Sequence, residues 1–299
     1  MKRSLIAALC LLGGVLPGCG NSDSTDTTTT PTAATTQSTL TFTSTITGSP
    51  VVGARVVVAG SSYTTGADGS IALSTPAAIG ATIDASAPGF LDRVTALSTT
   101  PALTLWEIPA GADVAFVRQL AYNRAGTAEV LWRPTAANIL LQITGEIASD
   151  PAVRAAHVLA AAMASAVTGG KVTVQLGSPV STGITFTLQL GPSGQGATTT
   201  YLTQSGGVIQ GGRVEYASAA AARDVRVIAH ESGHMRGFGH APSGFMCPNA
   251  CGVDNFSPVE QAVYVSMWQR NPGTAALDND RRLITGSSTS TAVFSCDIR

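Results

Sequence analysis

The chain has few charged residues and almost no lysine. Its 299 residues include 17 Lys and Arg against 18 Asp and Glu, and charged residues make up 12% of the sequence, about half the share that is typical of soluble domains. Lysine occurs only at Lys2 and Lys171. Because nucleic-acid binding depends on clustered Lys and Arg that neutralise phosphates, the sequence excludes a nucleic-acid-binding protein with a basic surface.

Long hydrophobic runs are absent beyond the N-terminus. The longest is the Ala-rich segment 158–167, about half the ~20 residues that a membrane-spanning helix needs. The sequence therefore excludes a polytopic membrane protein. The length favours about two domains, on a typical size of 100–200 residues each.

The N-terminus has the pattern of an export signal. Residues 1–3 (Met-Lys-Arg) supply a positive region, and residues 5–16 supply an apolar segment of signal-peptide length. Residues 16–19 (Leu-Pro-Gly-Cys) resemble the lipobox of bacterial lipoproteins. That resemblance implies a signal peptide at 1–18, a lipid anchor on Cys19 and a place in the cell envelope, at an outer membrane or the cell surface. Secretion without an anchor is the alternative.

Two further segments precede the C-terminal region. Residues 19–39 are mostly Ser, Thr, Asp, Ala, Pro and Gln and predict a disordered tether or an O-glycosylated stalk. Residues 40–108 contain short β-branched runs separated by turns, such as the hairpin signal 66–69 (Gly-Ala-Asp-Gly), and predict a small all-β sandwich. With the turn 88–90 (Pro-Gly-Phe) and the run 51–56, this pattern resembles carboxypeptidase regulatory-like domains. The resemblance implies a spacer or a module that presents substrate; structural support is the alternative.

Helical and strand patterns alternate from residue 110 to residue 299, so we expect an α+β fold. Helices are predicted at 113–124, from Pro151 to about 167, from near Ser218, and from Pro258 to about 270. Strands are predicted at 139–144, 172–176, 184–190 and 208–216. The helix from Ser218 would carry the motif with the most specific chemistry.

Three of the four histidines lie within residues 230–240, which read His-Glu-Ser-Gly-His-Met-Arg-Gly-Phe-Gly-His. His230 and His234 are four residues apart, so both rings leave one face of a helix. Gly237 can end this helix in a left-handed conformation and let the chain return with His240 as a third ligand. Three protein ligands leave the fourth position of a tetrahedral Zn²⁺ ion open to water.

Glu231 stands beside the first of these ligands. Zinc lowers the pKa of a bound water to about 7, so a neighbouring carboxylate can accept its proton at neutral pH. The hydroxide attacks a polarised carbonyl, and Glu231 returns the proton to the leaving amine. The pattern predicts hydrolysis of peptide bonds with one zinc ion and Glu231 as general base.

The string resembles the signature of the metzincin metallopeptidases, which is followed by a Met-turn. The resemblance implies a catalytic domain at 110–299, with a twisted sheet, an active-site helix and a C-terminal helix. Met246 is the Met-turn candidate, which in that family forms an apolar floor beneath the metal and is not a ligand. The position two residues after Met246 holds Pro248, so the extra Tyr ligand of the astacin-like branch is absent.

The remaining cysteines and the fourth histidine carry weaker signals. Cys247, Cys251 and Cys296 remain beyond the export segment, so we expect one disulfide and one leftover thiol, with the pairing open. A structural role outweighs a metal role for His157.

The expected function is an exported, lipid-anchored zinc endopeptidase that acts as a monomer on proteins or peptides. Two alternatives remain: a zinc-bound surface protein that binds without hydrolysis, and a zinc amidase that acts on cell-wall peptides. A binding protein needs the zinc ligands but not Glu231, so the carboxylate favours a hydrolase.

Overall fold

The computed structural model describes residues 36–125, 128–177, 183–192, 196–204, 206–248, 253–282 and 290–296. The predicted signal peptide, Cys19 and most of the predicted tether lie outside the described residues. The first strand, β1, spans Thr36–Ser44, so it begins before the end that we expected for the tether at residue 39. This early start follows from strand pairing, because Thr36 lies opposite Ala78 of strand β4 (Ser70–Ala78).

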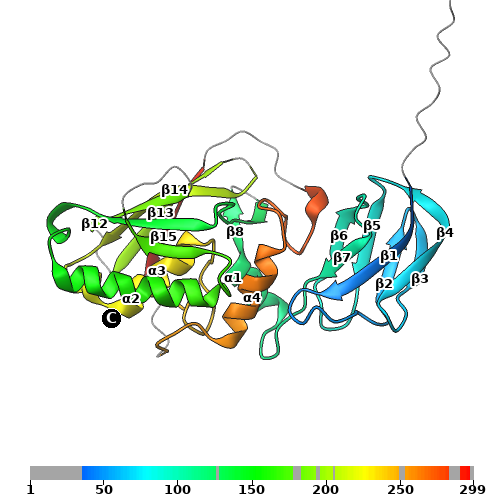
Figure 1. The fold of residues 1–299 in the computed structure, drawn as a ribbon, viewed down its shortest axis with the longest axis horizontal. Coiled ribbons are helices and arrows are strands. Elements are labelled where there is room, and N and C mark those ends of the chain that lie inside the picture. Colours follow the sequence, from blue (N-terminus) through cyan, green and yellow to red (C-terminus); the bar gives the residue numbers. More distant parts are fainter. Residues whose placement is uncertain are drawn as a thin grey trace, which may run out of the picture. The chain divides into compact units, whose positions relative to one another are not determined.

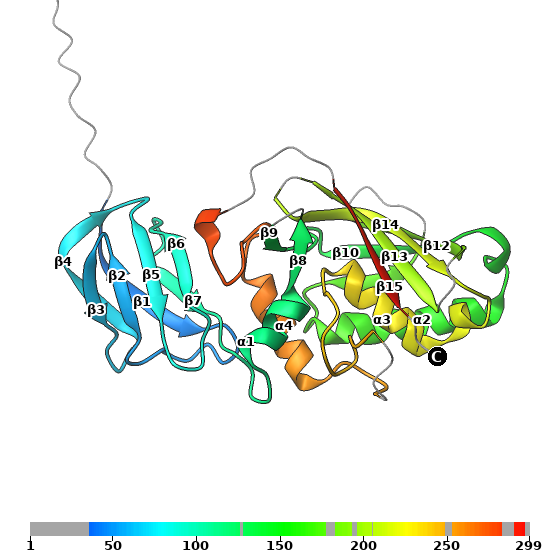
Figure 2. The same cartoon turned by 180° about the vertical axis from the view of Figure 1, so that it is seen from behind.

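Seven strands form two sheets around one hydrophobic core (Figures 1 and 2). The remaining strands are β2 Arg55–Val58, β3 Ser61–Thr64, β5 Thr82–Ser86, β6 Arg93–Ala96 and β7 Ala102–Leu105. One sheet has the order β4-β1-β7 and the other β3-β2-β5-β6. Leu40 and Phe42, two residues apart on β1, are fully buried, as expected for a strand with one face on a core.

The turn at residues 66–69 does not form the hairpin that the sequence predicts. Strand β3 pairs with β2, and β4 pairs with β1, so the turn carries the chain from one sheet to the other. Gly69 has a φ of +73°, and a Cβ there would lie 2.5 Å from the carbonyl oxygen of Phe42. The glycine signal located the turn, but a turn motif does not say which strands it joins into a ladder.

The second part of the chain contains a six-stranded sheet of order β11-β10-β12-β14-β13-β15. Its strands are β10 Asn138–Ile143, β11 Thr173–Leu176, β12 Ile184–Leu190, β13 Ala197–Gln204, β14 Val208–Tyr216 and β15 Ser290–Cys296. The first four in sheet order are parallel, and β13 is antiparallel to both of its neighbours. The sequence predicted the four parallel strands but neither β13 nor β15, nor the hairpin of β8 (Tyr122–Ala125) and β9 (Ala128–Leu131).

The helices of the described residues are α1 Val114–Ala121, α2 Pro151–Val167, α3 Val225–Met235 and α4 Pro258–Trp268, with short 3₁₀ helices η1 Gly145–Ile147, η2 Ala221–Arg223 and η3 Asp280–Arg282. Helix α2 has its predicted start, because the Asp150 side chain accepts two N–H groups of the first turn. Helix α3 begins later than predicted. Asp224 caps it by accepting the N–H of Arg226, and the residues after Ser218 form η2 instead. Helix α1 ends early because the chain continues directly into β8.

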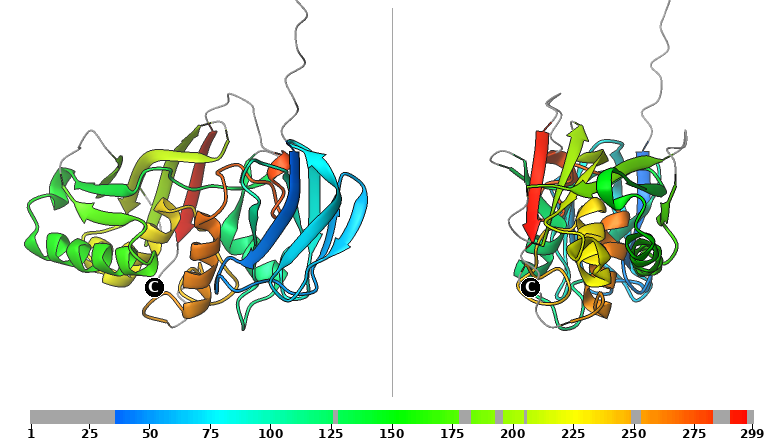
Figure 3. Two further views of the ribbon diagram at one scale, coloured as in Figure 1. Left: turned by 45° about the vertical axis from the view of Figure 1, so that its right-hand side comes forward. Right: turned by 90° about the vertical axis from the view of Figure 1, so that its left-hand side faces the viewer.

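Helices α2 and α3 contact each other and the six-stranded sheet, and Figure 3 shows them on one side of it. The structure is therefore of the mixed α+β class, as predicted. No helix of the described residues is both long enough and apolar enough to cross a bilayer.

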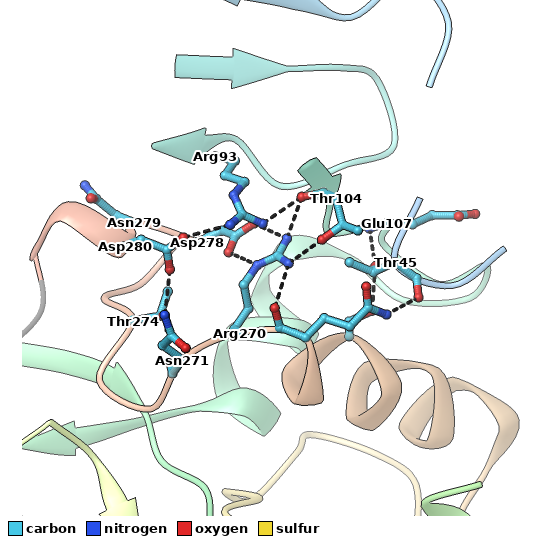
Figure 4. A network of polar contacts seen from close by, with 12 residues as sticks. Thr45, Arg93, Thr104, Glu107, Arg270, Asn271, Thr274, Asp278, Asn279 and Asp280 are labelled. Carbon is cyan, nitrogen blue, oxygen red and sulfur yellow. Dashed lines mark hydrogen bonds and ion pairs between the residues drawn. The ribbon is translucent and has the colours of Figure 1, made fainter. Parts of the chain in front are cut away.

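A polar network around a buried ion pair joins the β1–β7 region to the rest of the fold (Figure 4). Arg270 donates from Nη2 to Oδ2 of Asp278 at 2.8 Å, and both side chains are fully buried. The same guanidinium donates to the hydroxyl and the carbonyl oxygen of Thr104 on β7, at 2.7 and 3.0 Å. Arg93 of β6 donates to Asp280 at 2.8 Å. The two regions share one polar network and belong to one compact unit.

Replacement of Arg270 by methionine would leave the Asp278 carboxylate buried without its direct partner. We expect Arg270→Met to lower the free energy of unfolding by about 3–5 kcal/mol, measured by guanidinium titration. Arg118→Met is the matched control, since it removes an exposed arginine from an ion pair with Glu129 and should change stability little. Equal stability of the two variants would contradict the importance of the buried pair.

Candidate metal centre

Three histidines from helix α3 and the turn after it form a cluster. The ring nitrogens that could bind a metal all lie within 4.8 Å of one another, and the ring centroids are 4.8–5.6 Å apart. His230 and His234 are buried, and His240 is half-buried. The structure thus brings the three predicted ligands together, close enough to hold one metal ion.

Hydrogen bonds to the backbone fix the tautomers of the two helical histidines. Nδ1 of His230 lies 2.8 Å from the carbonyl oxygen of Phe245, and Nδ1 of His234 lies 2.7 Å from that of Phe238. Because a carbonyl oxygen can only accept, each Nδ1 carries the proton and each Nε2 presents a lone pair. Proteins orient metal-binding imidazoles in this way.

Burial keeps the imidazoles neutral. Desolvation lowers the pKa of His230 to about 4 and that of His234 well below its ordinary value. Desolvation also lowers the pKa of His240. At neutral pH the three rings are therefore uncharged, which is the form that binds a metal ion.

Gly237 turns the chain back after α3. Its φ is +102°, and a Cβ at this position would lie 1.7 Å from the carbonyl oxygen of Trp132, so only glycine fits. Asn123 of β8 donates from Nδ2 to the Gly237 carbonyl at 2.7 Å and holds the turn from the other side. The left-handed residue predicted at the helix end is confirmed, and the next residues bring His240 into the cluster.

Met246 is fully buried and packs against α3. A Cβ added to Gly233 would lie 2.3 Å from the Met246 sulfur, so the missing side chain at 233 makes room for the thioether. Glu260, the capping-box residue of α4, accepts the backbone N–H of Met246 at 2.8 Å. Helix α4 thereby fixes the segment whose Phe245 carbonyl orients the first ligand. The sequence predicted a helix from Pro258 but not this contact.

Arg236 ties the end of α3 to neighbouring elements. Its fully buried guanidinium donates to the carbonyl oxygens of Ser232 and Ala164, both at 2.9 Å, and lies 4.9 Å from the ring centre of Phe256. Burial lowers the pKa of Arg236 to about 10, so the side chain stays charged at neutral pH. Although it lies within the histidine string, this residue anchors the helix and is not part of the cluster.

Glu231 lies on α3 beside the first ligand and is fully buried. Its Oε2 accepts a hydrogen bond from the hydroxyl of Thr199 on β13. This contact places the carboxylate at the inner face of the sheet. Burial first, and the charge of Glu231 second, raise the pKa of Tyr216 on β14 well above its ordinary value. No motif in the sequence pointed to Thr199 or Tyr216.

The fourth histidine lies outside the cluster. His157 is buried on α2, donates from Nδ1 to the Val153 carbonyl at 2.8 Å and accepts from the Tyr216 hydroxyl at Nε2, at 3.0 Å. Cys247 forms a disulfide, in line with the prediction of one disulfide among Cys247, Cys251 and Cys296. The side chains of Cys251 and Cys296 lie outside those that the structure describes, so the pairing stays open.

Substitution of Gly237 by alanine tests the turn that delivers the third ligand. We expect Gly237→Ala to lower the free energy of unfolding by about 1–3 kcal/mol more than Gly48→Ala, because the new Cβ collides with backbone. Gly48 is the matched control: it has a φ of +70° but nothing within 4 Å of an added Cβ. Guanidinium unfolding measures the difference, and metal titration should show weaker binding by Gly237→Ala alone. Equal losses in the two variants would contradict the steric argument.

The chain was also compared with family models, with curated proteins and with solved structures, and none of the three comparisons gives a match. The chemistry assigned to this centre therefore depends on its own residues. These are three neutral imidazoles with oriented rings, a buried carboxylate on the same helix, and the turn that completes the cluster.

Proposed function

We propose that the protein is an exported zinc endopeptidase of the metzincin type. One observation carries the proposal. Helix α3 and the turn after it bring together three neutral imidazoles, and the buried carboxylate of Glu231 lies beside the first of them. The glycine that ends the helix and the buried Met246 follow these residues in the order of the metzincin pattern.

The donor set fits zinc. Imidazole nitrogen is a preferred ligand of Zn²⁺, and three protein ligands are typical of catalytic sites with an open position. The oriented Nε2 atoms of His230 and His234, with His240, would hold the ion. Zinc bound there supplies a Lewis acid that acidifies water and polarises a carbonyl group.

The protein's own contribution to the reaction is proton transfer by Glu231. The carboxylate accepts a proton from the attacking water and delivers it to the peptide nitrogen as the C–N bond breaks. The products are a new carboxyl group and a new amine. His240 is the ligand with solvent exposure, so we expect the peptide to reach the centre from its side.

The proposal also covers the cellular location and the role of the β1–β7 region. The signal sequence and Cys19 support anchoring in the cell envelope, where the enzyme would act as a monomer on proteins or peptides. The β1–β7 region would act as a fixed support of the catalytic region, because Arg270 and Arg93 join the two through partly buried hydrogen bonds.

Metal analysis combined with a peptide-library assay of the full-length protein tests the proposal. We expect one zinc ion per chain and cleavage that chelation abolishes. Glu231→Gln should retain zinc but lose about 10²–10⁴-fold in kcat, because it keeps the shape of the side chain and loses the base. Glu146→Gln, at an exposed glutamate, is the matched control and should cleave like the wild type.

The outcomes separate the candidate functions. Zinc binding without cleavage of any peptide would support the non-hydrolytic binding protein, and cleavage of cell-wall peptides alone would support the amidase. A wild-type protein that binds no metal would exclude all three.

A further inference from the structure

The inner face of β13 carries a polar side chain, Thr199, among buried neighbours. Thr199 is fully buried, as are Ala197 of the same strand and Val214 and Tyr216 of β14. Thr199 lies opposite Val214, and Ala197 lies opposite Tyr216, so the four side chains share the face that packs on helix α3. Valine would fill the same space without burying a polar group, so the presence of the threonine hydroxyl needs an explanation.

The reason is a hydrogen bond to Glu231. The Thr199 hydroxyl donates to Oε2 of the carboxylate, and both side chains are completely buried. A buried hydroxyl and a buried carboxylate are each costly to leave unsatisfied, and a hydrogen bond that involves a charged group is stronger than a neutral one. The contact therefore stabilises one orientation of a side chain that otherwise has three rotatable bonds.

The donor is held rigidly. Strand β13 pairs with β14 on one side and with β15 on the other, and Thr199 lies within both ladders, opposite Val214 and Phe294. On helix α3, Glu231 directly follows His230. The carboxylate and the first predicted ligand therefore belong to adjacent residues of one helix. A contact between two such elements can hold a reactive group to within a fraction of an ångström.

We infer that Thr199 is a positioning residue that holds the Glu231 carboxylate for proton transfer; this inference rests on the proposed peptidase function. A general base must lie within about 2.6–3.2 Å of the proton that it accepts, and a displacement of about 1 Å is enough to cost about 100-fold in rate. Thr199 does not touch the substrate. It acts through Glu231 alone.

The first test compares Thr199→Val, which removes the hydroxyl, with Thr199→Ser, which keeps it. In the zinc-loaded full-length protein we expect Thr199→Val to lower kcat by about 10–100-fold, with KM and zinc content unchanged. Thr199→Ser should recover most of that loss. Thr200→Val, the same change at the next residue and so on the opposite face of β13, is the matched control and should behave like the wild type.

The second test needs no metal and no activity. Unfolding midpoints of the metal-free wild type, Thr199→Val, Glu231→Ala and the double variant form a cycle that isolates the contact. Thr199→Val should lower the midpoint in the wild-type background but not beside Glu231→Ala, where the hydroxyl has lost its acceptor.

The results separate this inference from the proposed function. A wild-type protein without peptidase activity contradicts the proposed function, whatever the cycle shows. An active wild type overturns the positioning role if Thr199→Val matches Thr200→Val in kcat, if Thr199→Ser is as impaired as Thr199→Val, or if the shifts in the cycle are additive.

Discussion

The histidine cluster, the candidate metal centre, depends on two hydrogen bonds from imidazole to backbone. Nδ1 of His230 and Nδ1 of His234 donate to the carbonyl oxygens of Phe245 and Phe238, and these bonds leave Nε2 of each ring with its lone pair. Helical spacing alone puts the two rings on one face but leaves each ring free to rotate and to change tautomer. The chemistry of the centre is therefore set by the backbone that supplies the two carbonyls, and the surrounding structure must hold that backbone still.

Different elements hold the two carbonyls. The Phe238 carbonyl follows Gly237, whose conformation allows the chain to pass close to Trp132, and Asn123 binds the turn from β8. The Phe245 carbonyl precedes Met246, whose N–H is bound by the Glu260 carboxylate at the start of α4. The orientation of each ring thus depends on an element outside the histidine string. A substitution that disturbs β8 or α4 would alter the centre by changing the orientation of a ring.

The features that the sequence predicted correctly are those that depend on neighbouring residues. His230 and His234 are one helical turn apart, and the positive φ of Gly237 at the helix end is a conformation that glycine favours by itself. Helix α2 has its predicted bounds because Asp150 caps its first turn and the residues directly after 167 end its last turn. Strand pairing follows other rules. The glycine turn at 66–69 marks a reversal of the chain, but which strands pair was decided by contacts with β1 and β2, which no local pattern contains.

Strand β13 shows that local sequence patterns also fail to predict a contact at the candidate metal centre. It contains three consecutive threonines, 198–200, and nothing in the sequence distinguishes one hydroxyl from the next. The difference arises only when β14 fixes the register and α3 covers one face, because alternation then turns Thr199 inward toward Glu231 and its two neighbours away. Burial of a polar side chain on the inner face of a strand costs free energy unless the side chain is hydrogen-bonded, so its partner indicates its role. Here the partner is the carboxylate next to the first ligand, which makes the sheet, as well as the helix, part of the catalytic arrangement that we propose.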